Sequence, residues 1–377
     1  MTPNWVGFLK RTAIVCLLVL YGPFTSAQDA KTDTRPGLPP DIRDDETKLK
    51  VQRGDFVAVP IPISNPTLGT GLVAGAAYFY PQDEEQKKLQ PASLTAAAGM
   101  YTSNDSKAFV LVQQNYWNRD KWRVTGAIGV ADLRLSLLAP DESSGTESVD
   151  WRIRGSFLFT KVATRIKGDW YGGITARLVD AEQRIETASL PPEFEPMSDL
   201  RSVGLGLYFE YDSRDMPLNS HSGGHFTFAT LFNDEAIGSD STYQSYSAAY
   251  QSYHRLTDSV VLAWEIRGCG REGMAPLWDA CKIKLRGFAA TDYLGQNSAS
   301  SQVEARWQVS KRWGLVTFVG AGSIGSSYND LRENEAIPSY GVGVRFMVLA
   351  AKRINIRVDY ARSTDSDAIY LSVGEAF

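Results

Sequence analysis

The sequence is poor in side chains that bind metals or act as nucleophiles, with only three cysteines and three histidines among 377 residues. His221, His225 and His254 show neither metal-site spacing with the cysteines nor a nucleophile motif, so we expect no metal site and no cofactor. Acidic and basic residues are spread along the chain, which carries a formal charge of −4 and contains no basic block. This distribution excludes nucleic acid as the main partner.

Long apolar runs are absent beyond the N-terminus, so residues 28–377 contain no candidate membrane helix. Two basic residues precede an apolar run at residues 13–21, and the small residues Thr25 to Ala27 follow. This pattern predicts a signal peptide over residues 1–27. The alternative is a membrane anchor, but about ten apolar residues are too few to cross about 30 Å of hydrocarbon. Residues 28–54 are polar and rich in Pro and Asp, and we interpret them as a periplasmic linker.

Cysteine use fits an exported protein. Cys16 would leave with the signal peptide, so only Cys269 and Cys281 remain in the mature chain. In an oxidising compartment we expect these two to form a disulfide, which would stabilise the loop by about 3 kcal/mol. The alternative is a pair of free thiols, because sequence does not reveal their geometry.

Alternation of apolar and polar residues dominates residues 55–377. In residues 340–348 the even positions are apolar, whereas Gly or Arg occupies the odd positions from 341 to 345. Residues 354–360 and 151–159 show the same period of two. This period predicts β-strands, but it does not by itself separate a β-sandwich from a barrel.

The connections favour a barrel. We count sixteen strands, and through most of the chain short polar connections alternate with long ones, as in bacterial outer-membrane barrels with short periplasmic turns. The connection at residues 81–92 breaks the pattern, because it is long where a short turn is expected. Tryptophans beside the short turns suggest a membrane-interface girdle, although core tryptophans of a sandwich are the alternative. They are Trp117, Trp122, Trp170 and Trp313, and Tyr171 beside Trp170 is expected to join them.

Three motifs, in this order, resemble the BamA/TamA-type outer-membrane assembly and translocation superfamily, and the resemblance covers residues 55–377. The segment Tyr211 to Gly224, between the eighth and ninth strands, is similar to the family's Asp-Thr-Arg-Asp…Pro…Gly turn through Asp212, Arg214, Asp215, Pro217 and Gly223. The segment "LRGF", residues 285–288, is similar to the Val-Arg-Gly-Phe/Tyr motif on the loop between strands eleven and twelve. The chain ends at Phe377, similar to the C-terminal signal by which the barrel assembly machinery inserts outer-membrane proteins.

The resemblance implies that the loop with Arg286, Gly287 and Phe288 folds into the lumen, where its Arg meets acidic groups. Alternation places Glu304 on the lumen face as one partner. Gly320 stands where the family has a second carboxylate, so we expect only one partner. The planar guanidinium can bind a carboxylate through two hydrogen bonds. The alternative is a surface-loop Arg286 with no partner.

The resemblance also suggests a function. We expect a barrel that inserts or translocates a protein or lipid, in contact with outer-membrane lipids and lipopolysaccharide, for a client that the sequence does not identify. The 27 residues from 28 to 54 are too few for the family's periplasmic POTRA modules. The alternatives are a passive channel or surface antigen and, more remotely, an outer-membrane lipid hydrolase. We expect no enzyme, because turn-forming residues alone explain the composition around Asp212 and His221.

The first strand suggests where such a barrel would open. Residues 56–63 are predicted to form strand one, in which Pro60 and Pro62 provide no backbone donors. We therefore expect a weak seam between strands one and sixteen.

Overall fold

The structure is a computed structural model. It describes residues 54–141, 145–185, 199–216, 219–289, 291–349, 353–364 and 366–377. The predicted signal peptide, the linker up to residue 53 and Pro217 of the turn motif lie outside the described residues. No helix in the described ranges is long and apolar enough to cross a membrane.

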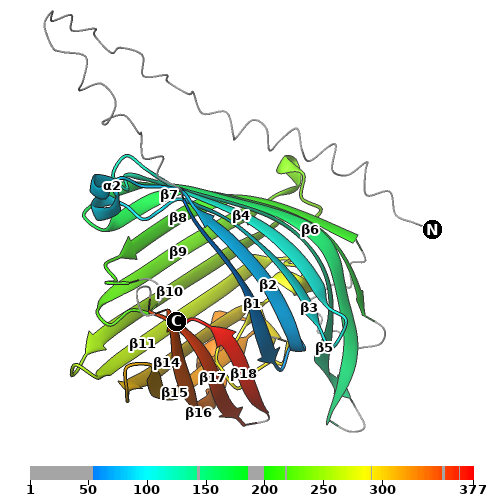
Figure 1. Cartoon of the computed structure of the whole chain (residues 1–377). Helices are drawn as coiled ribbons and strands as arrows, with labels where there is room; N and C mark the ends of the chain where they lie inside the picture. Colours follow the sequence, from blue (N-terminus) through cyan, green and yellow to red (C-terminus); the bar gives the residue numbers. More distant parts are fainter. Residues whose placement is uncertain are drawn as a thin grey trace, which may run out of the picture. The chain divides into compact units, whose positions relative to one another are not determined.

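Sixteen antiparallel strands close into a barrel (Figure 1), which confirms the predicted fold and strand number. Each strand pairs with the next along the chain, except that β11 pairs with β14 and β1 with β18. The barrel strands are β1 Asp55–Asn65, β2 Gly69–Phe79, β3 Leu94–Thr102, β4 Lys107–Trp117, β5 Trp122–Asp141, β6 Gly145–Lys167, β7 Trp170–Ile185, β8 Asp199–Asp212, β9 Gly223–Asn233, β10 Tyr243–Arg255, β11 Val260–Gly273, β14 Asn297–Gln308, β15 Trp313–Gly325, β16 Ile337–Leu349, β17 Ile354–Ser363 and β18 Asp367–Val373.

Short elements decorate the connections. The helix α2, Glu84–Leu89, lies in the long connection between β2 and β3, and α3, Tyr328–Glu333, lies between β15 and β16. The 3-10 turns η2, Glu235–Ile237, and η3, Leu277–Asp279, follow β9 and β11. The two-residue strands β12, Cys281–Lys282, and β13, Leu294–Gly295, pair with each other between β11 and β14. The chain from β11 to β14 therefore contains the predicted eleven-to-twelve loop, here called the lumen loop, residues 274–296.

The outer face of the barrel is apolar and the inner face polar along most strands. Val342 and Val344 on β16 are 58% and 40% exposed, whereas Arg345 is 4% exposed. On β14, Val303 is exposed and the adjacent Glu304 is completely buried. Because side chains alternate between the two faces of a strand, the register of strand pairing determines both which residues face the lipid and which face the lumen.

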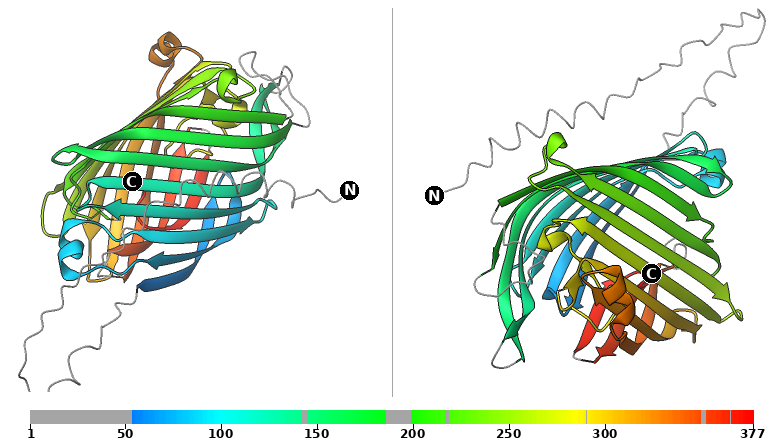
Figure 2. Two further views of the ribbon diagram at one scale, coloured as in Figure 1. Left: turned by 90° about the horizontal axis from the view of Figure 1, so that it is seen from above. Right: turned by 180° about the vertical axis from the view of Figure 1, so that it is seen from behind.

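The long strands β5 and β6 reverse this pattern near one end. They have 20 and 23 residues, about twice the 9 to 11 that cross a bilayer, and reach well beyond their neighbours (Figure 2). There Trp151 is buried with Leu135 and Leu137, whereas Arg152 is half exposed and pairs with Asp132. The alternation in residues 151–159 thus marks an apolar inner face at this level.

The aromatic girdle lies where the turns are short. Exposed tryptophans border these turns. We call the end of the barrel that carries the short turns the turn end, and the opposite end the loop end. These tryptophans are Trp117, Trp122, Trp170 and Trp313, whereas Tyr171, expected with them, is 1% exposed and its hydroxyl hydrogen-bonds Asp120. Amphipathic rings at this level are typical of a membrane interface.

The seam between β1 and β18 has the sparsest pairing in the barrel. Only Ser64 and Leu371 are in register across it, whereas β1 pairs with β2 along all eleven residues from Asp55 to Asn65. Every other pair of adjacent barrel strands shares at least seven register positions. Few hydrogen bonds therefore hold this edge.

Candidate functional site in the barrel lumen

The lumen loop is fastened to β11 at its start. A disulfide joins Cys269, on the inner face of β11, to Cys281, with the two Cα atoms 5.7 Å apart. Cys281 is 1% exposed. The disulfide predicted from the sequence is thus present and encloses the short turn η3 in a closed loop.

Arg286 lies in a buried polar pocket on the adjoining wall, which is formed by β14, β15 and β17. Its Nη1 is 2.9 Å from Asp359 Oδ2 on β17, and its Nη2 forms an ion pair with Glu304 on β14. Its Nε donates to Gln302 Oε1 at 3.2 Å. The guanidinium carbon lies 3.4 Å from the centre of the Phe318 ring on β15, a cation–π contact. Three strands of the wall thus surround one side chain.

Asp359 corrects the expectation of a single carboxylate partner. A second carboxylate is present, but it comes from β17 and not from position 320 on β15. At Gly320 a Cβ atom would lie 2.6 Å from the carbonyl oxygen of Ser301, so the wall leaves no room there for a side chain. The barrel supplies the second negative charge from two strands further along the wall.

Further arginines surround these carboxylates. Glu304 also binds Arg306 at 2.6 Å, and Asp359 also binds Arg345 and Arg357. Glu304 and Asp359 are both completely buried. Glu375, beyond β18, completes the cluster through a 2.8 Å ion pair with Arg345. Buried charges of this kind are costly unless they are paired, and each charged group of the cluster has a partner of opposite charge, although the buried Nε of Arg357 has no hydrogen-bond partner among the described residues.

Gly287 and Phe288 attach the loop to the last strands. Gly287 has φ +99°, and its N–H donates to the hydroxyl of Tyr370 on β18 at 2.8 Å. Its carbonyl oxygen accepts a hydrogen bond from Ser366 Oγ at 2.5 Å. A Cβ at this glycine would approach the backbone of Arg362 to 3.1 Å, and the positive φ already disfavours any other residue. Phe288 is buried with Ile283 and Leu285.

The other part of the loop contacts the far wall through Asp279, a residue that the sequence reading missed. Its Oδ2 lies 2.6 Å from Arg177 Nη2 on β7 and accepts from the Tyr243 hydroxyl at 3.0 Å. The adjacent Leu277 packs against Leu135 and Trp151. No period or motif distinguished Asp279 from other acidic loop residues. The loop therefore crosses the lumen, with contacts on β5–β7 and on β14–β18.

The β8–β9 turn also reaches another part of the barrel. Asp212 and Arg214 form an ion pair at 2.8 Å. Asp215 lies 2.7 Å from Arg353, which follows β16, and accepts the N–H of His221 at 2.9 Å. Burial alone would raise the pKa of Asp215, but these hydrogen bonds outweigh it and hold the pKa below its usual value. The turn motif thus joins two turns at the turn end.

Gly223 shows why this turn requires glycine. It has φ +94°, and a Cβ there would lie 2.2 Å from the carbonyl oxygen of Ser213. The polar side chains of the turn are engaged in its own backbone and ion pairs, which fits the interpretation of the motif as a structural turn.

One group of side chains has the composition of a metal site. Single ligand atoms of Glu210, Asp212 and His225 lie within 4.8 Å of one another. However, Glu210 already binds Arg123 at 3.1 Å, and Asp212 binds Arg214. Because these cations compensate both carboxylates, we assign no metal to the group.

The C-terminal residues leave the sheet before the chain ends. β18 ends at Val373, and Gly374 follows with φ +88°. Beyond it, the main-chain oxygen of Phe377 accepts a hydrogen bond from Arg306 at 2.8 Å. The role of Phe377 as an insertion signal stays a prediction, but the structure places this residue against the inner wall.

Comparisons with known proteins give the family. The model of the Omp85 superfamily domain matches residues 115–377, and the chain belongs to this superfamily. It is a β-barrel of the bacterial outer membrane. No curated protein sequence matches the chain.

Solved structures show the same fold at low sequence identity. BamA from Haemophilus ducreyi lacking POTRA domains 1–3 is 13% identical with a TM-score of 0.59, over 85% of this chain and 70% of that one. CdiB from Escherichia coli is 12% identical with a TM-score of 0.57, over 85% of this chain and 62% of that one. CdiB from Acinetobacter baumannii is 10% identical with a TM-score of 0.54, over 86% of this chain and 60% of that one. The chain thus spans less than two thirds of each CdiB.

Proposed function

We propose that this barrel inserts or translocates a protein or lipid at the outer membrane, with the lumen loop as its gate. The observation that carries the proposal is the buried contact of Arg286 with Glu304 and Asp359 on the wall next to the seam. The fold likeness to BamA and CdiB supports a role in this class.

The contacts of the loop explain how gating would work. Tyr370, on β18, hydrogen-bonds Gly287 and Phe288, while β18 itself meets β1 at one register position only. A docked loop thus holds β18, which β17 pairs along seven positions but which β1 meets at only one. Undocking would remove these contacts and open the lumen, so one movement would affect both the pore and the seam.

We propose no enzymatic activity. In the β8–β9 turn, Asp212 pairs with Arg214, and Asp215 is engaged by Arg353 and by backbone N–H groups. A lipid-hydrolysis assay on the purified barrel tests this point, and we expect no turnover. If the barrel does hydrolyse lipid, the variants Asp215→Asn and His221→Gln show whether the β8–β9 turn is responsible. Turnover that survives both substitutions would place the catalytic centre elsewhere.

A depletion strain tests the proposed function. We expect loss of specific outer-membrane proteins or lipids, measured by proteomics and lipid analysis, and restoration by the wild-type chain. Complementation with Arg286→Ala should restore these components less well than the matched control Arg184→Ala, whose side chain is 73% exposed and, among the described residues, forms an ion pair with Glu182 alone. Depletion that changes no protein or lipid, together with steady solute conductance, would instead identify a passive channel.

A further inference from the structure

Six neighbouring strands, β1 to β6, present an apolar face to the lumen. Arg177 on β7 points inward, because it binds Asp279 of the lumen loop. Phe159 on β6 is in register with Arg177 and therefore lies on the same face of the sheet. The row continues across β5, β4, β3, β2 and β1 through Ala127, Val112, Ala96, Ala77 and Val57. From β1 to β6 every position of this inner row is apolar.

The next two inner rows toward the loop end have the same character. One includes Phe157 on β6 and Val110 on β4, and the other includes Met100 on β3 and Val73 on β2. From β2 to β6 these rows contain only apolar residues and glycine. We call this inner face of β1–β6 the apolar wall.

Much of the apolar wall remains accessible from the lumen. The hydrophobic contacts of the lumen loop with β5 and β6 lie nearer the loop end, around Leu135 and Trp151. Val112, Phe157 and Phe159 are only half-buried and belong to none of the hydrophobic clusters in the described part of the chain. A wide apolar surface without a cover is typical of a binding site.

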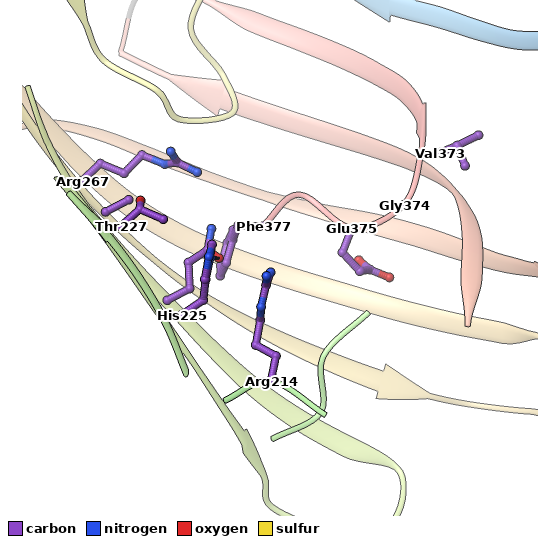
Figure 3. Close-up of a pocket in the computed structure, with 10 residues that line it drawn as sticks. Arg214, His225, Thr227, Arg267, Val373, Gly374, Glu375 and Phe377 are labelled. Carbon is purple, nitrogen blue, oxygen red and sulfur yellow. Dashed lines mark hydrogen bonds between the residues drawn. The ribbon is translucent and has the colours of Figure 1, made fainter. Parts of the chain in front are cut away.

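Elsewhere the inner face is polar, and its charges are compensated. Figure 3 shows Arg214, His225 and Arg267 around a cavity of about 390 Å³ beside the C-terminal residues. Arg214 pairs with Asp212 and Arg267 with Glu265. A lining of paired charges needs no ligand, whereas an apolar surface is stabilised when water leaves it.

The chemistry of the apolar wall favours an acyl chain over a polypeptide. β3 pairs with both β2 and β4 at every position from Leu94 to Tyr101, so the backbone there is already hydrogen-bonded. A polypeptide on this wall would leave its own N–H and C=O groups without partners, a cost that an acyl chain does not have. The polar residues 28–53 match the wall poorly for the same reason.

The apolar wall is also continuous with the lipid-facing surface around the edge of β1. Phe56 and Val57 point to opposite faces of this strand, and both are exposed. β1 meets β18 only at Ser64, so residues 55–63 have no partner strand on this side in the described part of the chain. An acyl chain can therefore pass around this edge without leaving apolar surface.

We propose that the apolar wall binds the acyl chains of a membrane phospholipid inside the lumen. The inference deepens the proposed function, because it names lipid as the substrate class, and it rests on that function for the step from binding to transport.

Photo-crosslinking in intact cells tests the site. With p-benzoyl-phenylalanine in place of Val112 or Phe157, we expect phospholipid adducts in mass spectra of the full chain purified after irradiation. The same side chain in place of Leu111, on the outer face of β4, is the positive control. In place of Thr227, which lines the cavity in Figure 3, it should give no lipid adduct.

Substitutions in the apolar wall should weaken the binding. With the crosslinking side chain in place of Ala96, the double variant Val112→Gln and Phe157→Gln should lower the yield of lipid adduct by about tenfold, because two apolar contacts are lost. Leu111→Gln makes the same kind of change on the outer face and should leave the yield unchanged. The melting temperature of each variant separates a lost site from a lost fold.

Lipid adducts at Leu111 without adducts at Val112 and Phe157 overturn the proposal. Adducts of these two inner positions with another protein, or with residues 28–53, also overturn it, because they identify a polypeptide as the occupant. Inner lipid adducts in cells whose outer membrane does not change on depletion of the barrel would support the binding site and refute the transport function. A depletion effect without inner lipid adducts would refute the binding site alone.

Discussion

Replacing Arg286 with alanine removes the side chain that joins the lumen loop to the wall. The variant loses the ion pairs with Glu304 and Asp359 and the cation–π contact with Phe318. Breaking a buried ion pair costs about 3 to 5 kcal/mol because a charge stays buried without its partner. We expect the lower value, since Glu304 keeps Arg306 and Asp359 keeps Arg345.

A loss of about 3 kcal/mol corresponds to about a 100-fold shift from the docked toward the undocked loop. Planar-bilayer recordings should therefore show higher or more strongly fluctuating conductance for Arg286→Ala than for the wild type. Arg286→Lys should give an intermediate effect, because one ammonium group cannot replace a planar fork held between two carboxylates. Arg184→Ala serves as the matched control on the exposed face.

The reasoning is refuted if Arg286→Ala leaves conductance, loop protection in hydrogen exchange and barrel stability all unchanged. Such a result would mean that the disulfide and Asp279 hold the loop without help from Arg286.

Three further predictions address separate contacts. In a double-mutant cycle on barrel stability, Arg286→Ala and Asp359→Asn should show a coupling energy of about 0.5 to 3 kcal/mol. Additive effects would contradict the ion pair between Arg286 and Asp359. The double variant Cys269→Ser and Cys281→Ser should destabilise the loop by about 3 kcal/mol, measured as faster exchange of residues 274–282, and unchanged exchange would contradict this. Because the folded-state pKa of Asp215 is below its usual 3.8, its stabilising contribution is fully present above pH 3.8 and is lost as the pH falls through the folded-state value. Amide hydrogen exchange in residues 219–224 should therefore become faster at acid pH in the wild type, whereas in Asp215→Asn it should be fast at every pH. The same pH dependence in both proteins would contradict the stabilising role of the Asp215 carboxylate.

The sequence predicts much of the barrel because its signals are local. A period of two places Glu304 and Asp359 on one face of their strands from their neighbours alone and gives sixteen strands, and the connection lengths favour a barrel. The ion pair between Asp359 and Arg286 could not be predicted from such local patterns. It depends on barrel closure, which brings β14, β17 and the lumen loop together around one side chain.

Other features escaped the sequence for different reasons. Asp279 lies in a loop whose path follows no period, so its contact with Arg177 appears only in three dimensions. Trp151 faces inward because β5 and β6 extend beyond the membrane level, where the lumen loop supplies an apolar partner in Leu277. Gly374 turns the chain away from β18, which a strand pattern that continues to Phe377 does not indicate.

Hydrogen exchange of β18 in the wild type and in Arg286→Ala tests most directly whether the loop holds the seam. Loss of the docked loop should speed exchange of the backbone amides of residues 367–373, while those of β9 and β10 keep their wild-type rates. Arg184→Ala should leave both regions unchanged. Exchange of β18 that is as slow as in β9 and β10, and that Arg286→Ala does not accelerate, would contradict the account.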